Sequence, residues 1–166
     1  MSYFFPLNCR VTPQLLASAQ TAADQIPLLN NSIRGGGGTL VGCIGEEGFQ
    51  HLFPGSVSQN TFQHDNIWNG WKIEIKTKQR KVTPRIDYSV SVSAYNATQK
   101  ADVYAFMSVY CDEATGRYIR VHFCGFYPTA DYCGDATFYN KGDYDPDNGY
   151  TAQADCYNLK MRELIR

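Results

Sequence analysis

The sequence lacks an excess of charge of either sign. It has 166 residues, with 15 Lys and Arg against 16 Asp and Glu, and a formal net charge of -1 at pH 7. A polycationic protein that coats nucleic acid through its overall field is therefore excluded. Locally, however, six basic residues stand between Lys72 and Arg85 against one acid, Glu74. Such a flank can follow a polyanion, although on its own it is equally typical of a solvated loop. The candidates for contact with nucleic acid are Lys78, Arg80 and Lys81.

Long apolar runs and paired cysteine motifs are also missing. The chain does not open with a basic and then apolar leader, and no window holds the roughly 18 apolar residues that a membrane span needs. The six cysteines include no CxxC pair, so we expect reduced thiols, a cytoplasmic protein and no membrane partner. A zinc site from His122, Cys124 and Cys133 is an alternative, but its spacing matches no standard zinc motif.

The first part of the chain has a helical pattern. Hydrophobic residues make up 43% of the sequence, and the length suits a single domain spanning 1–166. A helix is predicted at 13–30, where leucines and alanines recur at helical spacing. Thr12 can cap this helix with Pro13 in its first position, and Pro27 is expected to end or bend it.

A second helix is predicted at 39–53, after a four-glycine run at 35–38. That run lacks the Lys-Ser/Thr of a phosphate-binding loop, so we interpret it as a flexible link. Within the helix, Gly42, Gly45 and Gly48 are spaced three apart, and each costs about 1 kcal/mol relative to alanine. A smooth face that allows close approach of another backbone would explain that cost.

Strand patterns dominate the chain after the second helix. They are predicted at 61–67, 71–78, 88–94, 103–110 and 118–126, with a last strand near 151–159. Asn69-Gly70 between the first two is a strong hairpin signal, because both residues of such a turn take positive φ. The acidic segment 127–166 is otherwise predicted to be irregular. Helices followed by a run of strands indicate an α+β protein.

The segment DNIWNGWKIEIK, from Asp65 to Lys76, carries charge on both strands of this hairpin. Glu74 and Lys76 are two apart and share one strand face, whereas Ile73 and Ile75 point to the other. Pairing about the two-residue turn puts Asp65 opposite Glu74, with Cβ atoms about 4.5–5.5 Å apart. Two carboxylates and one ammonium group are therefore expected to meet.

Two opposed carboxylates repel each other unless a cation lies between them. Oxygen ligands suit Mg²⁺ or Mn²⁺, and the Ile75 carbonyl can add a third oxygen to those of Asp65 and Glu74. Lys76 can orient a water or stabilise developing negative charge. This combination of groups suits hydrolysis of a phosphodiester.

The same combination resembles the PD-(D/E)xK nuclease superfamily, in particular its small phage-type and Holliday-resolvase-like members. In that family a helix with a glutamate precedes a hairpin that carries an acid on its first strand and (D/E)xK on its second. Here GCIGEEGFQHLF is similar to the helix, Asp65 to the first acid and Glu74-Ile75-Lys76 to the ExK. The resemblance covers about residues 37–126.

The resemblance implies a restriction-endonuclease-like core, with a central mixed β-sheet flanked by helices, and a Mg²⁺-dependent nuclease acting on DNA. Asp65, Glu74 and Lys76 would be catalytic. Glu46 would be the accessory helix carboxylate, with Glu47 as its rival, because sequence does not fix the rotation of the helix. A homodimer would give two symmetry-related sites for the two strands of a duplex, and this type of relative favours a phage-encoded protein.

Other residues depart from the family pattern or lie outside it. His64 stands where the proline that names the motif is expected, and alternation directs it away from Asp65, which favours a packing role. Gln99 follows the third predicted strand, where the family often has further polar contacts; a plain surface role is its alternative.

The acidic stretch GDYDPDNGY, 142–150, is partly similar to a calcium-binding loop. Asp143, Asp145 and Asp147 have the alternate spacing, but Asn148 stands where such a loop needs glycine. We interpret the stretch as a turn-rich loop, whose negative charge should keep it away from bound DNA.

Two other functions remain open from the sequence alone. One is a nucleic-acid-binding module of the same fold without catalytic activity, and the other is a structural or interaction protein of a virus-like particle. The 12 tyrosines offer stacking surfaces for bases, although core packing is the simpler use of most of them.

Overall fold

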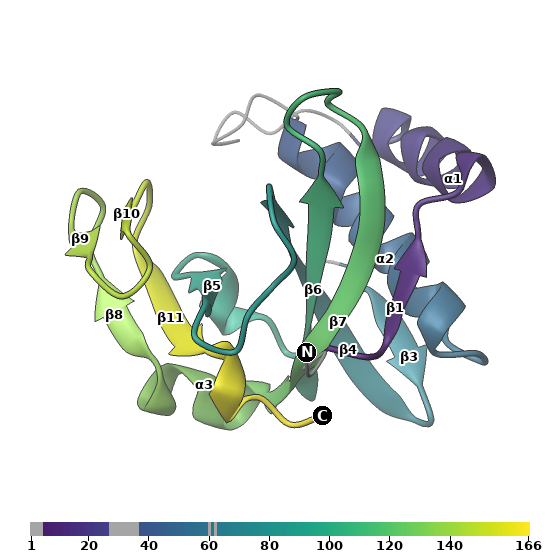
Figure 1. The fold of residues 1–166 in the computed structure, drawn as a ribbon. Helices are drawn as coiled ribbons and strands as arrows, with labels where there is room; N and C mark the ends of the chain where they lie inside the picture. Colours follow the sequence, from purple (N-terminus) through teal and green to yellow (C-terminus); the bar gives the residue numbers. More distant parts are fainter. Residues whose placement is uncertain (1–4, 27–36, 60, 62) are drawn as a thin grey trace.

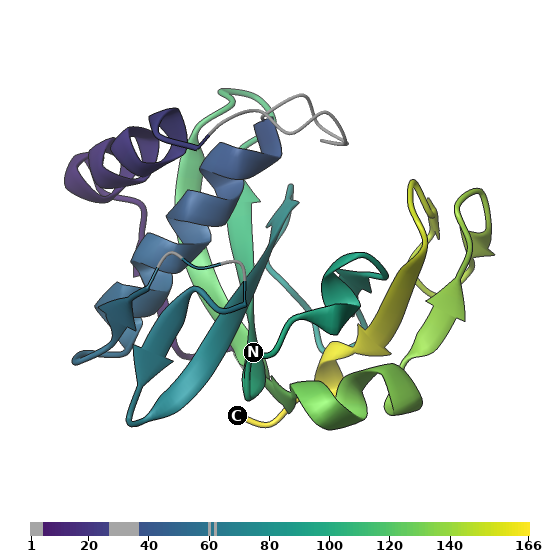
Figure 2. The same cartoon turned by 180° about the vertical axis from the view of Figure 1, so that it is seen from behind.

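A six-stranded mixed sheet forms the centre of the molecule, with helices on one side and a smaller sheet on the other (Figure 1). The computed structural model describes residues 5–26, 37–59, 61 and 63–166. Seen from behind, the same three layers follow one another, with the helices now to the left (Figure 2). The predicted α+β class, with a central mixed sheet flanked by helices, is confirmed.

The central sheet has the strand order β1-β7-β6-β4-β3-β2. Its strands are β1 (Asn8–Arg10), β2 (Val57–Ser58), β3 (Asn66–Trp68), β4 (Trp71–Arg80), β6 (Val103–Cys111) and β7 (Tyr118–Pro128). β4 and β6 run parallel, and the other neighbouring strands run antiparallel. A parallel pair needs a long crossover, so the chain between β4 and β6 is free to enter the next layer.

The hairpin between β3 and β4 is confirmed. Asn69 and Gly70 both have positive φ, 49° and 81°, and Trp68 pairs with Trp71 across the turn. The first strand was predicted too long, because β3 begins only at Asn66. The Thr61 hydroxyl accepts from the His64 N–H at 3.1 Å and donates to the His64 carbonyl at 2.8 Å. Such a side-chain turn competes with strand pairing.

Helices α1 (Pro13–Asp24) and α2 (Gly37–Leu52) cover one face of the central sheet (Figure 1). Ile44 and Phe49 of α2 form one core cluster with Ile73 and Ile75 of β4. Among the described residues, no helix is long and apolar enough to span a membrane.

The first helix is shorter than predicted. Its N-terminus is as expected, since the Thr12 hydroxyl accepts from the Leu15 N–H at 3.1 Å. At the other end, the N–H groups of Gln25 and Ile26 bond three residues back instead of four. The residue before a proline avoids helical geometry, so the helix is not expected to continue through Ile26; its last residue is Asp24. The rest of the predicted range, 27–30, lies outside the described residues.

Two of the helix glycines lie where α2 meets the sheet. A Cβ on Gly45 would lie 1.9 Å from the Thr77 hydroxyl oxygen, and one on Gly48 would lie 2.7 Å from Val121 Cγ1. A Cβ on Gly42 would meet nothing within 4 Å. Two of the three glycines, Gly45 and Gly48, are thus needed for the close contact of α2 with the sheet.

The third layer contains an antiparallel sheet of order β5-β11-β8 and a two-stranded pair, β9-β10. Its elements are β5 (Ser89–Ser93), η1 (Asn96–Thr98), α3 (Thr129–Asp135), β8 (Thr137–Tyr139), β9 (Tyr144–Asp145), β10 (Tyr150–Thr151), β11 (Cys156–Lys160) and η2 (Met161–Glu163). Most of them come from 127–166, which was predicted to be irregular apart from a last strand near 151–159; β11 lies close to that range. The sheet that β11 joins was not predicted, because β11 pairs with β5, a strand distant in sequence.

Candidate active site

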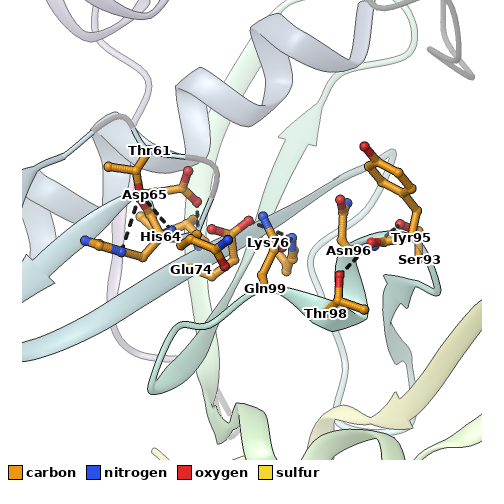
Figure 3. A network of polar contacts seen from close by, with 12 residues as sticks. Thr61, His64, Asp65, Glu74, Lys76, Ser93, Tyr95, Asn96, Thr98 and Gln99 are labelled. Carbon is orange, nitrogen blue, oxygen red and sulfur yellow. Dashed lines mark hydrogen bonds and ion pairs between the residues drawn. The ribbon is translucent and has the colours of Figure 1, made fainter.

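Glu74 and Lys76 lie side by side on β4, as their spacing predicted. The Lys76 ammonium donates to Glu74 Oε1 at 2.7 Å (Figure 3). The Lys76 and Glu74 side chains are only 14% and 7% exposed. Because the pair is shielded from water, its electrostatic interaction is stronger than that of an exposed surface pair.

Asp65 lies directly before β3 and completes the same edge of the sheet. Its Oδ2 accepts the Ile75 N–H at 2.8 Å, and its own N–H donates to the Ile73 carbonyl at 2.9 Å. In a strand the N–H and C=O of one residue point to the same side. The Ile75 carbonyl is therefore directed to the edge where the Asp65 carboxylate lies.

Gln99 also belongs to this group rather than to the open surface. It is the C-terminal cap of η1, and its Oε1 accepts from the Lys76 ammonium at 2.7 Å (Figure 3). The neighbouring Lys100 N–H donates to Gln63 Oε1 at 2.7 Å, which ties this turn to the loop before β3. Gln99 and Glu74 thus fix the Lys76 ammonium from two sides.

Glu46, and not Glu47, is the helix carboxylate that faces the hairpin acids. Burial raises the pKa of Glu46 to about 7, with further contributions from the charges of Glu74 and Glu47. Burial likewise raises the pKa of Asp65 to about 8, helped by Glu46 and Glu74 and opposed by the Ile75 N–H and Lys76. Each carboxylate therefore disfavours the charge of its neighbours.

Glu47 points elsewhere because one helical step is about 100°. It lines a groove of about 650 Å³ between α1, α2 and β1. Burial alone raises its pKa. The choice between the two glutamates, which the sequence left open, is thus made by the packing of α2 on β4.

The oxygen donors at this edge fit a hard divalent cation by their chemistry. Glu74 Oε2 is buried and has no hydrogen-bond partner, and the neighbouring oxygens are carboxylate and carbonyl groups. The side chains are not, however, gathered into a finished ligand shell: within the described parts of the chain, no three His, Cys, Asp or Glu residues form a group that could hold a metal ion.

The predicted basic flank divides into two parts. Lys78 and Arg80 share the β4 face of Lys76 and, like it, line a small cavity of about 30 Å³ toward the third layer. Arg80 Nη2 donates to the Ser89 carbonyl at 2.8 Å. Lys81, in contrast, is exposed and forms an ion pair with Glu113.

The acidic loop was predicted to stay away from bound DNA. In the structure it instead lies next to the basic face of β4. The Lys78 ammonium lies 5.5 Å from the centre of the Tyr150 ring, and the charge of Asp145 acts on Lys78. The expectation failed because Asp145 is only 2% exposed: its Oδ2 accepts from Asn158 and its Oδ1 from the Asp147 and Asn148 N–H groups. Both of its carboxylate oxygens are thus held by hydrogen bonds from its own loop and from β11.

Sequence reasoning missed the tyrosines that accompany these cations. Lys76 lies 5.8 Å from the ring centre of Tyr104, and Arg80 lies 5.1 Å from that of Tyr88. Only Tyr88 comes from a nearby segment, whereas Tyr104 and Tyr150 are far away in sequence. No local pattern identified these contacts.

Comparison with known proteins found no matching family model, no matching curated protein and no matching solved structure. The resemblance to PD-(D/E)xK nucleases therefore remains a hypothesis, carried by the residues of the hairpin and of α2.

Proposed function

We propose that this protein is a divalent-metal-dependent nuclease that hydrolyses phosphodiester bonds in DNA. One observation carries the proposal: Asp65, Glu74 and Glu46 surround the buried edge of β4, where Glu74 Oε2 has no partner and Lys76 is adjacent. Grouped carboxylates of this kind are costly for stability, so a functional use is the simplest account of them.

In this proposal the cation is held by the Asp65 and Glu74 carboxylates and the Ile75 carbonyl. Bound Mg²⁺, or Mn²⁺, would supply a Lewis acid and lower the pKa of a bound water. Lys76 stabilises the negative charge that develops on the phosphate oxygens, and Gln99 keeps its ammonium in place. Glu46, on the facing helix, accepts a proton from the attacking water.

A cleavage assay tests the proposal. Purified protein is incubated with linear duplex, circular, four-way-junction and single-stranded DNA in Mg²⁺ and in EDTA. We expect cleavage only with the metal. Lys76→Ala should lower the rate by roughly a hundredfold or more, because it removes charge stabilisation in a shielded site. Lys141→Ala, an exposed lysine between β8 and β9, is the matched control and should leave the rate unchanged.

A nucleic-acid-binding module without catalysis is the second candidate. It is favoured by the lack of a finished metal-ligand group among the residues described. DNA binding without cleavage of any of these substrates in Mg²⁺ or Mn²⁺ would support it against the nuclease. The homodimer remains a prediction, which follows only if both strands of a duplex are cut.

A further inference from the structure

The basic face of β4 has a regular spacing. Lys76, Lys78 and Arg80 are alternate residues of one strand, so their side chains leave the same face about 6.6 Å apart. Successive phosphates of an extended nucleic-acid strand have a similar separation. The row begins at the candidate active site and leads away from it.

Two of these cations have no carboxylate partner. Lys76 pairs with Glu74, but none of the ion pairs among the described residues includes Lys78 or Arg80. Arg80 Nε is buried without a hydrogen-bond partner. Burial lowers the pKa of Lys78 to about 8, and it also lowers that of Arg80. A bound anion would offset this cost of burying the two charges.

An exposed aromatic ring accompanies this row. Tyr150 of β10 lies 5.5 Å from the Lys78 ammonium yet remains 41% exposed. Tyr144 of β9 is opposite Thr151 in the same hairpin, so its ring, 62% exposed, leaves the other face. Of these two tyrosines, Tyr150 is therefore the one on the side of Lys78.

The acids near Tyr150 do not cancel this basic character. Asp145 is held by Asn158 and by backbone N–H groups of its own loop. Asp147 Oδ2 lies 3.7 Å from the Lys160 ammonium. Asp147 is thus paired with a lysine outside the row, and both oxygens of Asp145 already accept hydrogen bonds.

We propose that β4 and the β9–β10 hairpin bind a single strand of nucleic acid, with phosphates along Lys78 and Arg80 and one base stacked on Tyr150. An exposed ring can stack only on a base whose face is free, and the bases of a duplex cover one another. This inference rests on the proposed function, since it assigns the substrate class of the same site.

Binding in EDTA tests the inference separately from cleavage. Fluorescence anisotropy of labelled oligo(dT) is compared with that of a hairpin duplex of equal charge. We expect tighter binding of the single strand. Tyr150→Ala should weaken it roughly fivefold to a hundredfold, the usual contribution of one base–aromatic stack. Tyr150→Phe keeps the ring and should stay within about twofold, and Tyr144→Ala is the matched control on the opposite face.

The salt dependence distinguishes phosphate contact from stacking. Lys78→Ala should reduce the slope of log affinity against log salt by about 0.7, the value for one phosphate of a single strand. Tyr150→Ala should leave the slope unchanged. Tighter duplex binding, or equal losses for Tyr150→Ala and Tyr144→Ala, would overturn the inference. Binding with the expected pattern but without cleavage in Mg²⁺ would refute only the nuclease.

Discussion

Lys76 is held by two hydrogen bonds and by an aromatic ring in the candidate site. Its ammonium donates to Glu74 and to Gln99, each at 2.7 Å, and lies 5.8 Å from the ring centre of Tyr104. These contacts come from three strands and turns, which is why the group is so well fixed. Its charge only partly offsets the surrounding carboxylates, since the pKa of Asp65 is still raised to about 8.

Asp65→Asn tests whether the carboxylates are destabilising without a cation. In buffer at pH 9, above the raised pKa of Asp65, the amide keeps an oxygen for the Ile75 N–H but removes a negative charge near Glu46 and Glu74. In EDTA we expect the variant to melt a few degrees higher, which corresponds to about 1 kcal/mol of unfolding free energy. In Mg²⁺ the wild type should gain stability and the variant should gain less.

Thermal unfolding followed by circular dichroism measures both effects. Asp131→Asn, an exposed acid in the first turn of α3, is the control and should shift the melting temperature little in either buffer. A lower melting temperature for Asp65→Asn in EDTA would show that Asp65 stabilises the fold by itself and would contradict the repulsion argument.

At the scale of elements, the distance between α2 and β4 places Glu46 beside the hairpin acids. That distance depends on glycine, because a Cβ on Gly45 would lie 2.8 Å from the Thr77 Cβ and closer still to its hydroxyl. Thr77 follows Lys76 directly and faces the helix. Any outward shift of α2 therefore also moves Glu46 away from Glu74.

Gly45→Ala and Gly42→Ala form a matched pair on the same helix. We expect Gly45→Ala to lower the unfolding free energy by about 1–3 kcal/mol, because it overpacks the contact with Thr77. Gly42→Ala meets nothing within 4 Å and should stabilise by up to about 1 kcal/mol through helix propensity. Urea denaturation measures both changes.

The same pair has a functional readout if the nuclease proposal holds. Gly45→Ala should reduce the cleavage rate even at temperatures at which the variant is still folded, whereas Gly42→Ala should not. Equal stability of the two variants would mean that α2 does not need its close approach to β4.

At the scale of the whole molecule, the central sheet joins two separate apolar cores. One lies under α1 and α2, and the other lies between the sheet and the third layer. His122 of β7 is buried within this sheet, 4% exposed, opposite Ser108 of β6. Burial lowers its pKa to about 4, together with the charge of Arg120, against a backbone hydrogen bond at Ser108.

His122 predicts a loss of stability in mild acid. Its pKa is about 4 in the folded protein and 6.5 as the ordinary value, so between these values the unfolded chain binds the extra proton. Stability therefore falls as the pH drops from 6.5 towards 4 and stops falling from this cause below 4, by about 3 kcal/mol in all. The raised pKa values of Asp65 and Glu46 change stability in the opposite direction over the same range. The His122 contribution is therefore measured as the difference between the wild type and a His122 variant, from urea denaturation at pH 7 and pH 4.5.

The variant His122→Gln tests whether His122 causes this pH dependence. On going from pH 7 to pH 4.5, His122→Gln should lose less stability, or gain more, than the wild type, whatever its stability at pH 7. His51→Gln, an exposed histidine of α2, should show the wild-type change. The same change in His122→Gln as in the wild type would contradict the prediction.

Local rules were enough for the hairpin, because its signals lie within a few residues of one another. Asn69 and Gly70 fix the turn, the turn fixes the register, and strand alternation puts Glu74 and Lys76 on one face. The helix boundaries and the strand at 61–67 were less accurate. Pro27 restricts the residue before it, and the Thr61 hydroxyl bonds to the backbone three residues later. A periodic pattern of apolar residues contains neither effect.

The sequence by itself determined the β3–β4 hairpin and the common strand face of Glu74 and Lys76, since these depend on backbone preferences and on spacing along one or two strands. Only the tertiary structure decided that Glu46 rather than Glu47 faces the acids, that Gln99 holds Lys76, and that Tyr150 covers Lys78. Each of these contacts joins segments that meet only when α2, η1 and the third layer pack on the central sheet. Burial then sets their charges, and burial is a property of the assembled layers.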